Sequence, residues 1–135
     1  FKVSDHLGKK IVVFFFPKAD TSGCTAESIA FTNLNKKFEQ FNCVVIGISK
    51  DNKEKQGKFR RKHNLTCELG ADSENKVCEQ FGVWVEKSMY GRKYMGVQRA
   101  TFICNEKHII SSVWEKVKVP GHAEEVLAAI EKMDK

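Results

Sequence analysis

The sequence has few of the residues that cross-link a small fold or interrupt its helices and strands. It holds only two prolines among 135 residues, and its cysteines are few and scattered. There are five of them, an odd number with no Cys-x-x-Cys pair: Cys24, Cys43, Cys67, Cys78 and Cys104. This usage argues against a disulfide-stapled secreted scaffold and against a zinc ribbon. Each cysteine is then either an inert core residue or a reactive thiol in a reducing compartment.

Long hydrophobic runs are also missing. The longest unbroken apolar stretch is 11–16, far shorter than the roughly 20 residues that a membrane helix needs. The four histidines lack metal-ligand spacing with each other or with the cysteines, and no glycine-rich phosphate loop occurs. We therefore expect no metal, no other cofactor and no membrane contact.

Charge is unevenly spread along the chain. Lys and Arg number 23 against 17 Asp and Glu, which gives a net charge of +6. Residues 50–63 alone hold seven of the basic residues against two acidic ones. Phe59 is the single aromatic residue in this segment, without the interleaving of aromatic residues that nucleic-acid binding would favour, so we expect a solvated helix face and no nucleic-acid partner. Docking of a reductant is a second use that this basic segment could have.

Hydrophobic periodicity predicts one domain over 1–135, of the α/β class. Strands are expected at 10–17, 43–49, 66–69, 100–104 and 108–114, and helices at 25–41, 53–63, 74–81 and 121–133. The early alternation implies parallel strands with crossover helices, and the late hairpin adds antiparallel strands. The expected architecture is a central mixed β-sheet flanked by helices on both faces. The glycine-punctuated stretch 83–97 is assigned no element.

Cys24 differs from the other cysteines in its position. It follows a strong strand and a polar loop, and it begins the first long helix. Unpaired N–H groups and the positive end of the helix dipole favour the thiolate, which is the reactive form. The alternative is that Cys24 is simply a small residue near the helix cap.

The residues around Cys24 resemble a known active site. The segment 17–24 has the pattern Pro-x-x-x-Thr-x-x-Cys at a strand-to-helix junction, which resembles the motif of the peroxiredoxins. The longer string 14–25 is similar to one branch, the bacterioferritin comigratory protein or peroxiredoxin Q type. A second similar string follows downstream, at 82–84 and 89–102. The resemblance covers nearly the whole chain and implies a thioredoxin-like fold.

The resemblance also implies roles that suit the chemistry of each residue. Cys24 is the expected nucleophile, which attacks a peroxide oxygen and becomes a sulfenic acid. The Thr21 hydroxyl can both donate and accept, and Arg99 can stabilise the thiolate and a polarised oxygen together. Pro17 shields the thiolate, and Gly23 lets the oxidant approach the backbone. Taken singly, each also has a structural reading, as a strand end, a turn or a surface cation.

The second thiol of the reaction is less clear. Many members of this branch carry a resolving cysteine five positions after the first, where this chain has Ile29. Cys43 and Cys104 lie in predicted strands and are expected to be inert, whereas Cys67 and Cys78 are possible resolving cysteines. We expect a one-cysteine mechanism, with an external small thiol or a thioredoxin-like protein as reductant.

The leading hypothesis is thus an antioxidant thiol-dependent peroxidase that reduces hydrogen peroxide and organic hydroperoxides. The alternative is a non-catalytic thioredoxin-like binding or chaperone module that uses the basic helix. The family implies a monomer, and the absence of a visible secretory signal favours the cytoplasm. The family's N-terminal segment is missing or not included. Glu27 suits the first helical turn but falls on the apolar side, so it receives no role.

Overall fold

The fold is built on a five-stranded sheet. A computed structural model describes residues 8–16, 22–66, 68–71, 81–107, 109–115, 117 and 121–133. The strands, in the order β3-β2-β1-β6-β7 across the sheet, are β3 (Glu68–Ala71), β2 (Cys43–Ser49), β1 (Lys10–Phe15), β6 (Ala100–Cys104) and β7 (Ile110–Trp114). The β1–β2 and β2–β3 pairs are parallel, and the β1–β6 and β6–β7 pairs are antiparallel. The predicted α/β class with a mixed sheet is confirmed.

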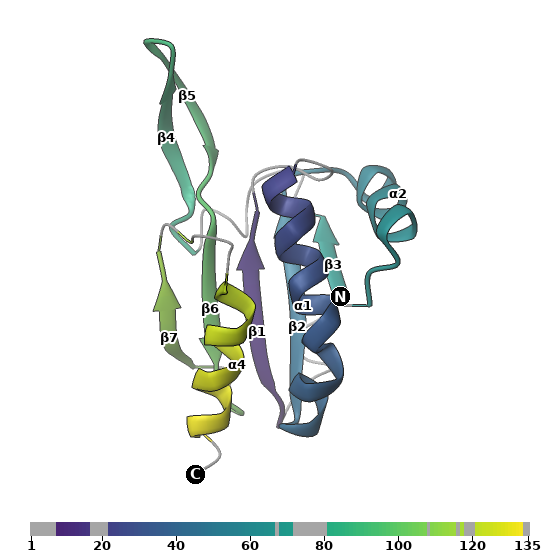
Figure 1. Ribbon diagram of the computed structural model, residues 1–135. Coiled ribbons are helices and arrows are strands. Elements are labelled where there is room, and N and C mark those ends of the chain that lie inside the picture. The colour runs from purple at the N-terminus through teal and green to yellow at the C-terminus, as the bar shows by residue number, and fades with distance from the viewer. Residues whose placement is uncertain are drawn as a thin grey trace.

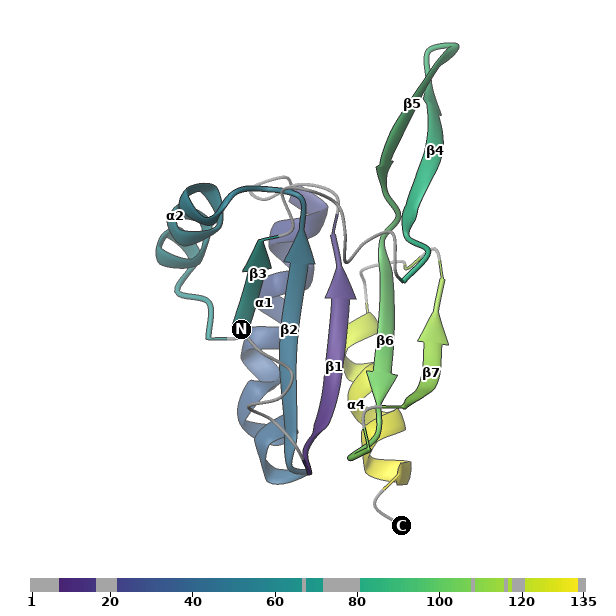
Figure 2. The ribbon, with the colours of Figure 1, turned by 180° about the vertical axis from the view of Figure 1, so that it is seen from behind.

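Two helices cover the same face of this sheet. They are α1 (Ser22–Gln40) and α4 (His122–Met133), while α2 (Lys53–His63) lies beside the β3 edge (Figures 1 and 2). Opposite α1 and α4, the sheet packs against Phe81, Val83 and Trp84. The helix predicted at 74–81 falls, apart from Phe81, outside the described residues. No helix among the described residues is both long and apolar enough to cross a membrane.

Strand β1 forms the centre of the core because both of its faces are buried. Its alternate residues enter two separate clusters, Val12 and Phe14 on the side of α1 and α4, and Val13 and Phe15 on the other. A strand buried on both faces reads as a continuous apolar run, which is why the sequence signal here is strong. Gly47 of β2 makes room for the Phe14 ring, since a Cβ there would lie 2.5 Å from its Cζ atom.

The basic helix α2 has the predicted bounds and two clear caps. Asn52 accepts a hydrogen bond from the Lys55 N–H at 2.9 Å, and Asn64 ends the helix in the left-handed conformation with a φ of 51°. Its buried side chains are Gln56 and Phe59. The basic side chains therefore lie on a surface-exposed helix face, as the sequence predicts.

The stretch 83–97 forms a hairpin that the sequence did not predict. Strands β4 (Trp84–Met89) and β5 (Arg92–Val97) pair with each other and project beyond the body of the molecule (Figure 1). A hairpin that stands away from the core has no face that must be uniformly apolar. It therefore lacks the alternation from which strands are recognised in a sequence.

Candidate active site

Cys24 lies in the first turn of α1. The helix begins at Ser22, three residues before the predicted start, so Cys24 is its third residue. The first N–H groups of a helix have no partner within the helix, and its dipole is positive at this end. The Cys24 side chain is 0% exposed and belongs to the core cluster beneath α1 and α4. Cys24 is therefore a buried sulfur in the positive field of a helix N-terminus.

The fold brings Arg99 to this sulfur from a distant part of the sequence. Arg99 precedes β6, whose first residue, Ala100, pairs with Phe15 at the end of β1. The end of β1 in turn leads to the start of α1. Arg99 Nη2 donates a hydrogen bond to Cys24 Sγ at 3.1 Å. A permanent cation in contact with the sulfur favours the thiolate over the thiol.

Glu27 completes the group from the same helix as Cys24. It lies three residues after Cys24, a spacing that places both side chains on one side of a helix. Arg99 Nη1 donates to Glu27 Oε1 at 2.6 Å, and the carboxylate is 1% exposed. Glu27 Oε2 has no hydrogen-bond partner among the described residues. The guanidinium fork thus bridges one sulfur and one buried carboxylate.

Sequence reasoning left Glu27 without a role. The available signal was its position, because an acidic residue on the apolar side of a helix must be paired when it is buried. The sequence alone does not show which cation pairs with it. That pairing depends on the register of β6 beside β1.

Burial sets the protonation of this pair. Desolvation raises the pKa of Glu27 to about 7, against the opposing charge and hydrogen bond of Arg99. Burial also pulls the pKa of Arg99 down, but Glu27 and Cys24 outweigh it, and the net shift of this pKa is upward. Arg99 therefore stays a cation while Glu27 titrates near neutral pH.

Two lysines add to the positive charge around the site. Partial burial lowers the pKa of Lys87 in β4, and the charges of Arg99 and Lys50 lower it further, whereas Cys24 opposes them. Lys50 Nζ lies 5.6 Å from the centre of the Trp84 ring at the base of the hairpin. The base of the hairpin is therefore part of the electrostatic environment of Cys24.

The structure describes only part of the remaining predicted site. Pro17 and Thr21 lie outside the described residues, so their roles remain predictions. Gly23 is described in its backbone and occupies the second position of α1. Its place in the first helical turn is compatible with the expected donation from its N–H group.

The remaining cysteines divide into two groups. Cys43 and Cys104 are buried in β2 and β6, as predicted, and carry thiols rather than disulfides. Burial raises the pKa of the Cys104 thiol. Cys67 and Cys78, the possible resolving cysteines, lie outside the described residues. In the part of the chain that the structure describes, no group of three His, Cys, Asp or Glu residues could hold a metal ion.

Comparison with known proteins supports the resemblance to the peroxiredoxins, as this geometry does. Residues 1–113 match the model of the AhpC/TSA family. The chain is 42% identical to the peroxiredoxin Bcp of Bacillus subtilis over 132 residues, which cover 98% of this chain and 84% of that protein.

Solved structures agree in fold along the whole chain. A cysteine-to-serine mutant of the peroxiredoxin Q of Xylella fastidiosa has a TM-score of 0.96 at 37% identity, and the match covers all of this chain and 84% of that one. The bacterioferritin comigratory protein of Xanthomonas campestris, studied for its alkyl peroxide reduction activity, has a TM-score of 0.95 at 33% identity, with coverage of 100% and 86%. The predicted thioredoxin-like fold is confirmed. The chain belongs to the AhpC/TSA family, in its bacterioferritin comigratory protein or peroxiredoxin Q branch, and is a thiol-dependent peroxidase.

Proposed function

We propose that Cys24 is the peroxidatic nucleophile of this peroxidase and that Arg99 is its catalytic cation. The observation that carries this assignment is the hydrogen bond of 3.1 Å from Arg99 Nη2 to Cys24 Sγ at the start of α1. By extension from the Xanthomonas relative, the substrates include alkyl hydroperoxides as well as hydrogen peroxide. The alternative, a non-catalytic binding module, is not favoured by relatives that are named peroxiredoxins.

The proposed reaction begins with attack of the Cys24 thiolate on one peroxide oxygen. A sulfur lone pair forms the S–O bond, and the O–O bonding pair leaves with the second oxygen. That oxygen takes up a proton and departs as an alcohol, or as water from hydrogen peroxide, while Cys24 becomes a sulfenic acid. Arg99 stabilises the negative charge as it moves from sulfur to the leaving oxygen.

The neighbouring residues have supporting roles in this proposal. Glu27 holds one arm of the Arg99 fork, so that the other arm is fixed on sulfur. It is therefore a positioning residue. Thr21 and the Gly23 N–H would orient the peroxide, and Pro17 would keep water from the thiolate, as the family motif implies.

The sulfenic acid is reduced by an external thiol in this proposal. The first thiol displaces water and forms a mixed disulfide with Cys24, and a second thiol releases Cys24 as a thiol and leaves as a disulfide. Ile29, at the position of the branch's resolving cysteine, packs partly buried against the core. Cys43 and Cys104 lie in the strands β2 and β6 of the central sheet and not on the helix that carries Cys24.

A direct experiment compares the wild-type protein with Cys24→Ser in peroxide consumption, using dithiothreitol and a thioredoxin system in parallel. The wild type should consume peroxide with both reductants, and the variant with neither. Non-reducing mass analysis after one equivalent of peroxide then tests the one-cysteine mechanism. A disulfide between Cys24 and Cys67 or Cys78 would replace it with a two-cysteine mechanism.

The proposal extends to the setting in which the enzyme acts. We place it in the cytoplasm, as a monomer formed by one domain over 1–135, without a nucleic-acid or membrane partner. The buried thiols of Cys24, Cys43 and Cys104 support a reducing compartment. Sedimentation at micromolar concentration tests the monomer, and fractionation of cells tests the compartment.

A further inference from the structure

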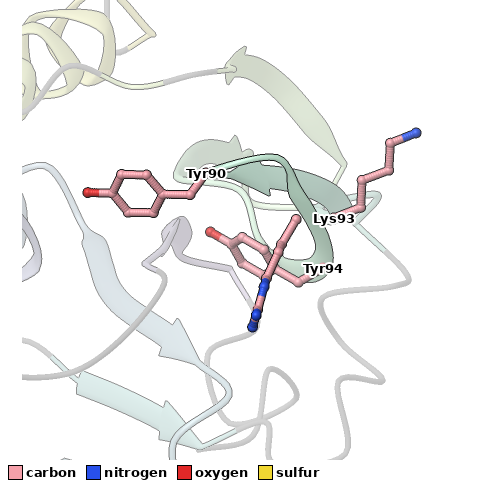
Figure 3. A pocket seen from close by; sticks show the side chains of 4 residues that line it. Tyr90, Lys93 and Tyr94 are labelled. Carbon is pink, nitrogen blue, oxygen red and sulfur yellow. The ribbon is translucent and has the colours of Figure 1, made fainter.

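The β4–β5 hairpin carries side chains that its own stability does not require. Tyr90 at its tip is 97% exposed, and Tyr94 and Met95 are also exposed. An open hollow of about 550 Å³ is lined by Tyr90, Arg92, Lys93 and Tyr94. Figure 3 shows Tyr90 and Tyr94 pointing to the same side of the hairpin and Lys93 pointing to the other. Exposed Tyr, Met and Arg side chains of this kind are enriched where proteins contact each other.

The turn itself favours a different residue at position 90. Tyr90 and Gly91 form a two-residue turn between the paired residues Met89 and Arg92. Both turn residues have positive φ, 52° for Tyr90 and 78° for Gly91. Asn-Gly is the preferred pair in such a turn, and a bulky residue at positive φ is strained. A fully exposed tyrosine in this conformation therefore points to a function in contact rather than in folding.

The same side of the hairpin is connected to the active site. Lys87 and Tyr94 are cross-strand partners, and a Cβ at Gly96 would lie 3.2 Å from Lys87 Cδ and 3.3 Å from Tyr94 Cε2. The Lys87 stem and the Tyr94 ring thus lie together over Gly96. Lys87 interacts electrostatically with Cys24 and Arg99. Arg99 follows β5 by two residues, so the hairpin rises directly from the wall of the site.

The charge of the hairpin and its distance from Arg99 along the chain indicate the kind of partner. On the side of Tyr94 the two strands hold the basic residues Lys87 and Arg92, while on the other side Lys93 forms an ion pair with the single acid Glu86. A second copy of this chain, at a net charge of +6, would be repelled. The eight residues from Arg92 to Arg99 span roughly 20 Å of extended chain, more than a small thiol can cover. An acidic protein that brings its own thiol to Cys24 fits both conditions.

From these observations we infer that the hairpin surface formed by Tyr90, Arg92 and Tyr94 docks an acidic dithiol protein that reduces the oxidised Cys24. The inference rests on the proposed function of Cys24 and adds the place and the charge of the reductant. A dithiol partner supplies both thiols of the reductive half, and it leaves with an internal disulfide.

The test separates the oxidative half of the reaction from the reductive half. The variants are Tyr90→Asn and Arg92→Glu, and the matched control is Arg61→Glu on the exposed face of α2, which makes the same change of charge. The reductants are an acidic thioredoxin, regenerated by NADPH and its reductase, and dithiothreitol. Oxidation of Cys24 by one equivalent of hydrogen peroxide is followed separately by mass analysis.

We expect kcat/KM for thioredoxin to fall by about tenfold or more in both hairpin variants, as it does when one interface hot spot is lost. This fall should come from a higher KM. Rates with dithiothreitol and the oxidation of Cys24 should stay near wild type, and Arg61→Glu should change neither half. Raising the salt concentration should slow the wild-type reaction with thioredoxin more than that of Arg92→Glu. Tyr90→Asn should unfold no more easily than wild type, which separates a docking role from a structural one.

Wild-type thioredoxin rates in both hairpin variants would overturn the inference and leave the proposed function intact. An equal loss in Arg61→Glu would do the same, by moving the docking surface to α2. Concentration-dependent dimers that Arg92→Glu abolishes, with unchanged thioredoxin rates, would identify a second copy as the occupant instead. Failure of wild-type Cys24 to be oxidised would overturn the proposed function itself and the inference with it.

Discussion

Cys24 and Cys104 are both buried thiols, in the two core clusters on opposite sides of the sheet, and only Cys24 is placed for chemistry. Cys24 is 0% exposed and Cys104 is 8% exposed. Cys104 ends a central strand, where burial raises the pKa of its thiol. Cys24 lies in the first turn of a helix and receives the Arg99 hydrogen bond at 3.1 Å. Exposure therefore does not distinguish a reactive cysteine from an inert one here. The distinction comes from the cation and the helix N-terminus.

The largest expected effect comes from removing one sulfur or the other. Cys24→Ser should lower peroxide consumption by roughly a thousandfold or more, because the nucleophile is lost. Cys104→Ala should stay within about twofold of wild type, with a loss of stability of about 1 kcal/mol from the smaller side chain. Stopped-flow peroxide kinetics and thermal unfolding measure the two quantities. A comparable loss of rate in Cys104→Ala would remove the contrast between the two cysteines.

The next effect tests the cation that separates the two cysteines. Arg99→Met should reduce the rate of Cys24 oxidation by about 10²- to 10³-fold, the loss typical of removing one donor to developing charge. Arg99→Lys should recover only part of this rate, because an ammonium cannot hold Cys24 and Glu27 with a planar fork. Arg61→Lys on α2 serves as the matched control and should react as the wild type does. Full activity of Arg99→Lys would show that charge suffices without the bidentate geometry.

Glu27 should add a pH dependence of stability that has its origin in the site. The pKa of Glu27 is about 7 in the folded chain, against an ordinary value of 4.5. Between these values the folded state holds a proton that the unfolded state releases, so the free energy of unfolding falls as the pH rises from about 4.5 to about 7. Glu27→Gln should remove this fall.

The measurement is denaturant unfolding of wild type and Glu27→Gln between pH 4 and pH 8, with Glu124→Gln on the exposed face of α4 as the control. The free energy of unfolding of wild type should fall relative to that of Glu27→Gln through this window and level off above it, whereas Glu124→Gln should run parallel to wild type. Parallel curves for Glu27→Gln would mean that the buried carboxylate is already ionised at low pH.

The smallest effect concerns the longer-range charge around Cys24. Lys87→Met should slow Cys24 oxidation by about two- to threefold at low ionic strength, because Lys87 is partly exposed and its field is screened by water. The difference should vanish in molar salt. Lys58→Met on α2 is the matched control, as its side chain is exposed and forms an ion pair with Glu54. A salt-independent loss in Lys87→Met would indicate a contact role instead.

The sequence predicted those parts of the molecule in which the local pattern of apolar residues matches the residues that are buried. The run 11–16 is apolar because both faces of β1 are buried, and Cys24 follows it at a recognisable strand-to-helix junction. The hairpin at 84–97 was missed because most of β5 is exposed, burial is confined to the base of the hairpin, and the two strands share no apolar pattern. Glu27 was missed because its partner lies 72 residues away, and only the β1–β6 register brings the two together.

The roles of Cys24 and Arg99 are best tested by identifying which sulfur a peroxide oxidises first. Wild-type protein is treated with less than one equivalent of hydrogen peroxide in the presence of dimedone, and the labelled cysteines are located by peptide mass analysis. We expect a dimedone adduct on Cys24 while Cys104 stays reduced, and slower labelling of Cys24 in Arg99→Met. Labelling of Cys104 before Cys24, or labelling of Cys24 at an unchanged rate without Arg99, would contradict these roles.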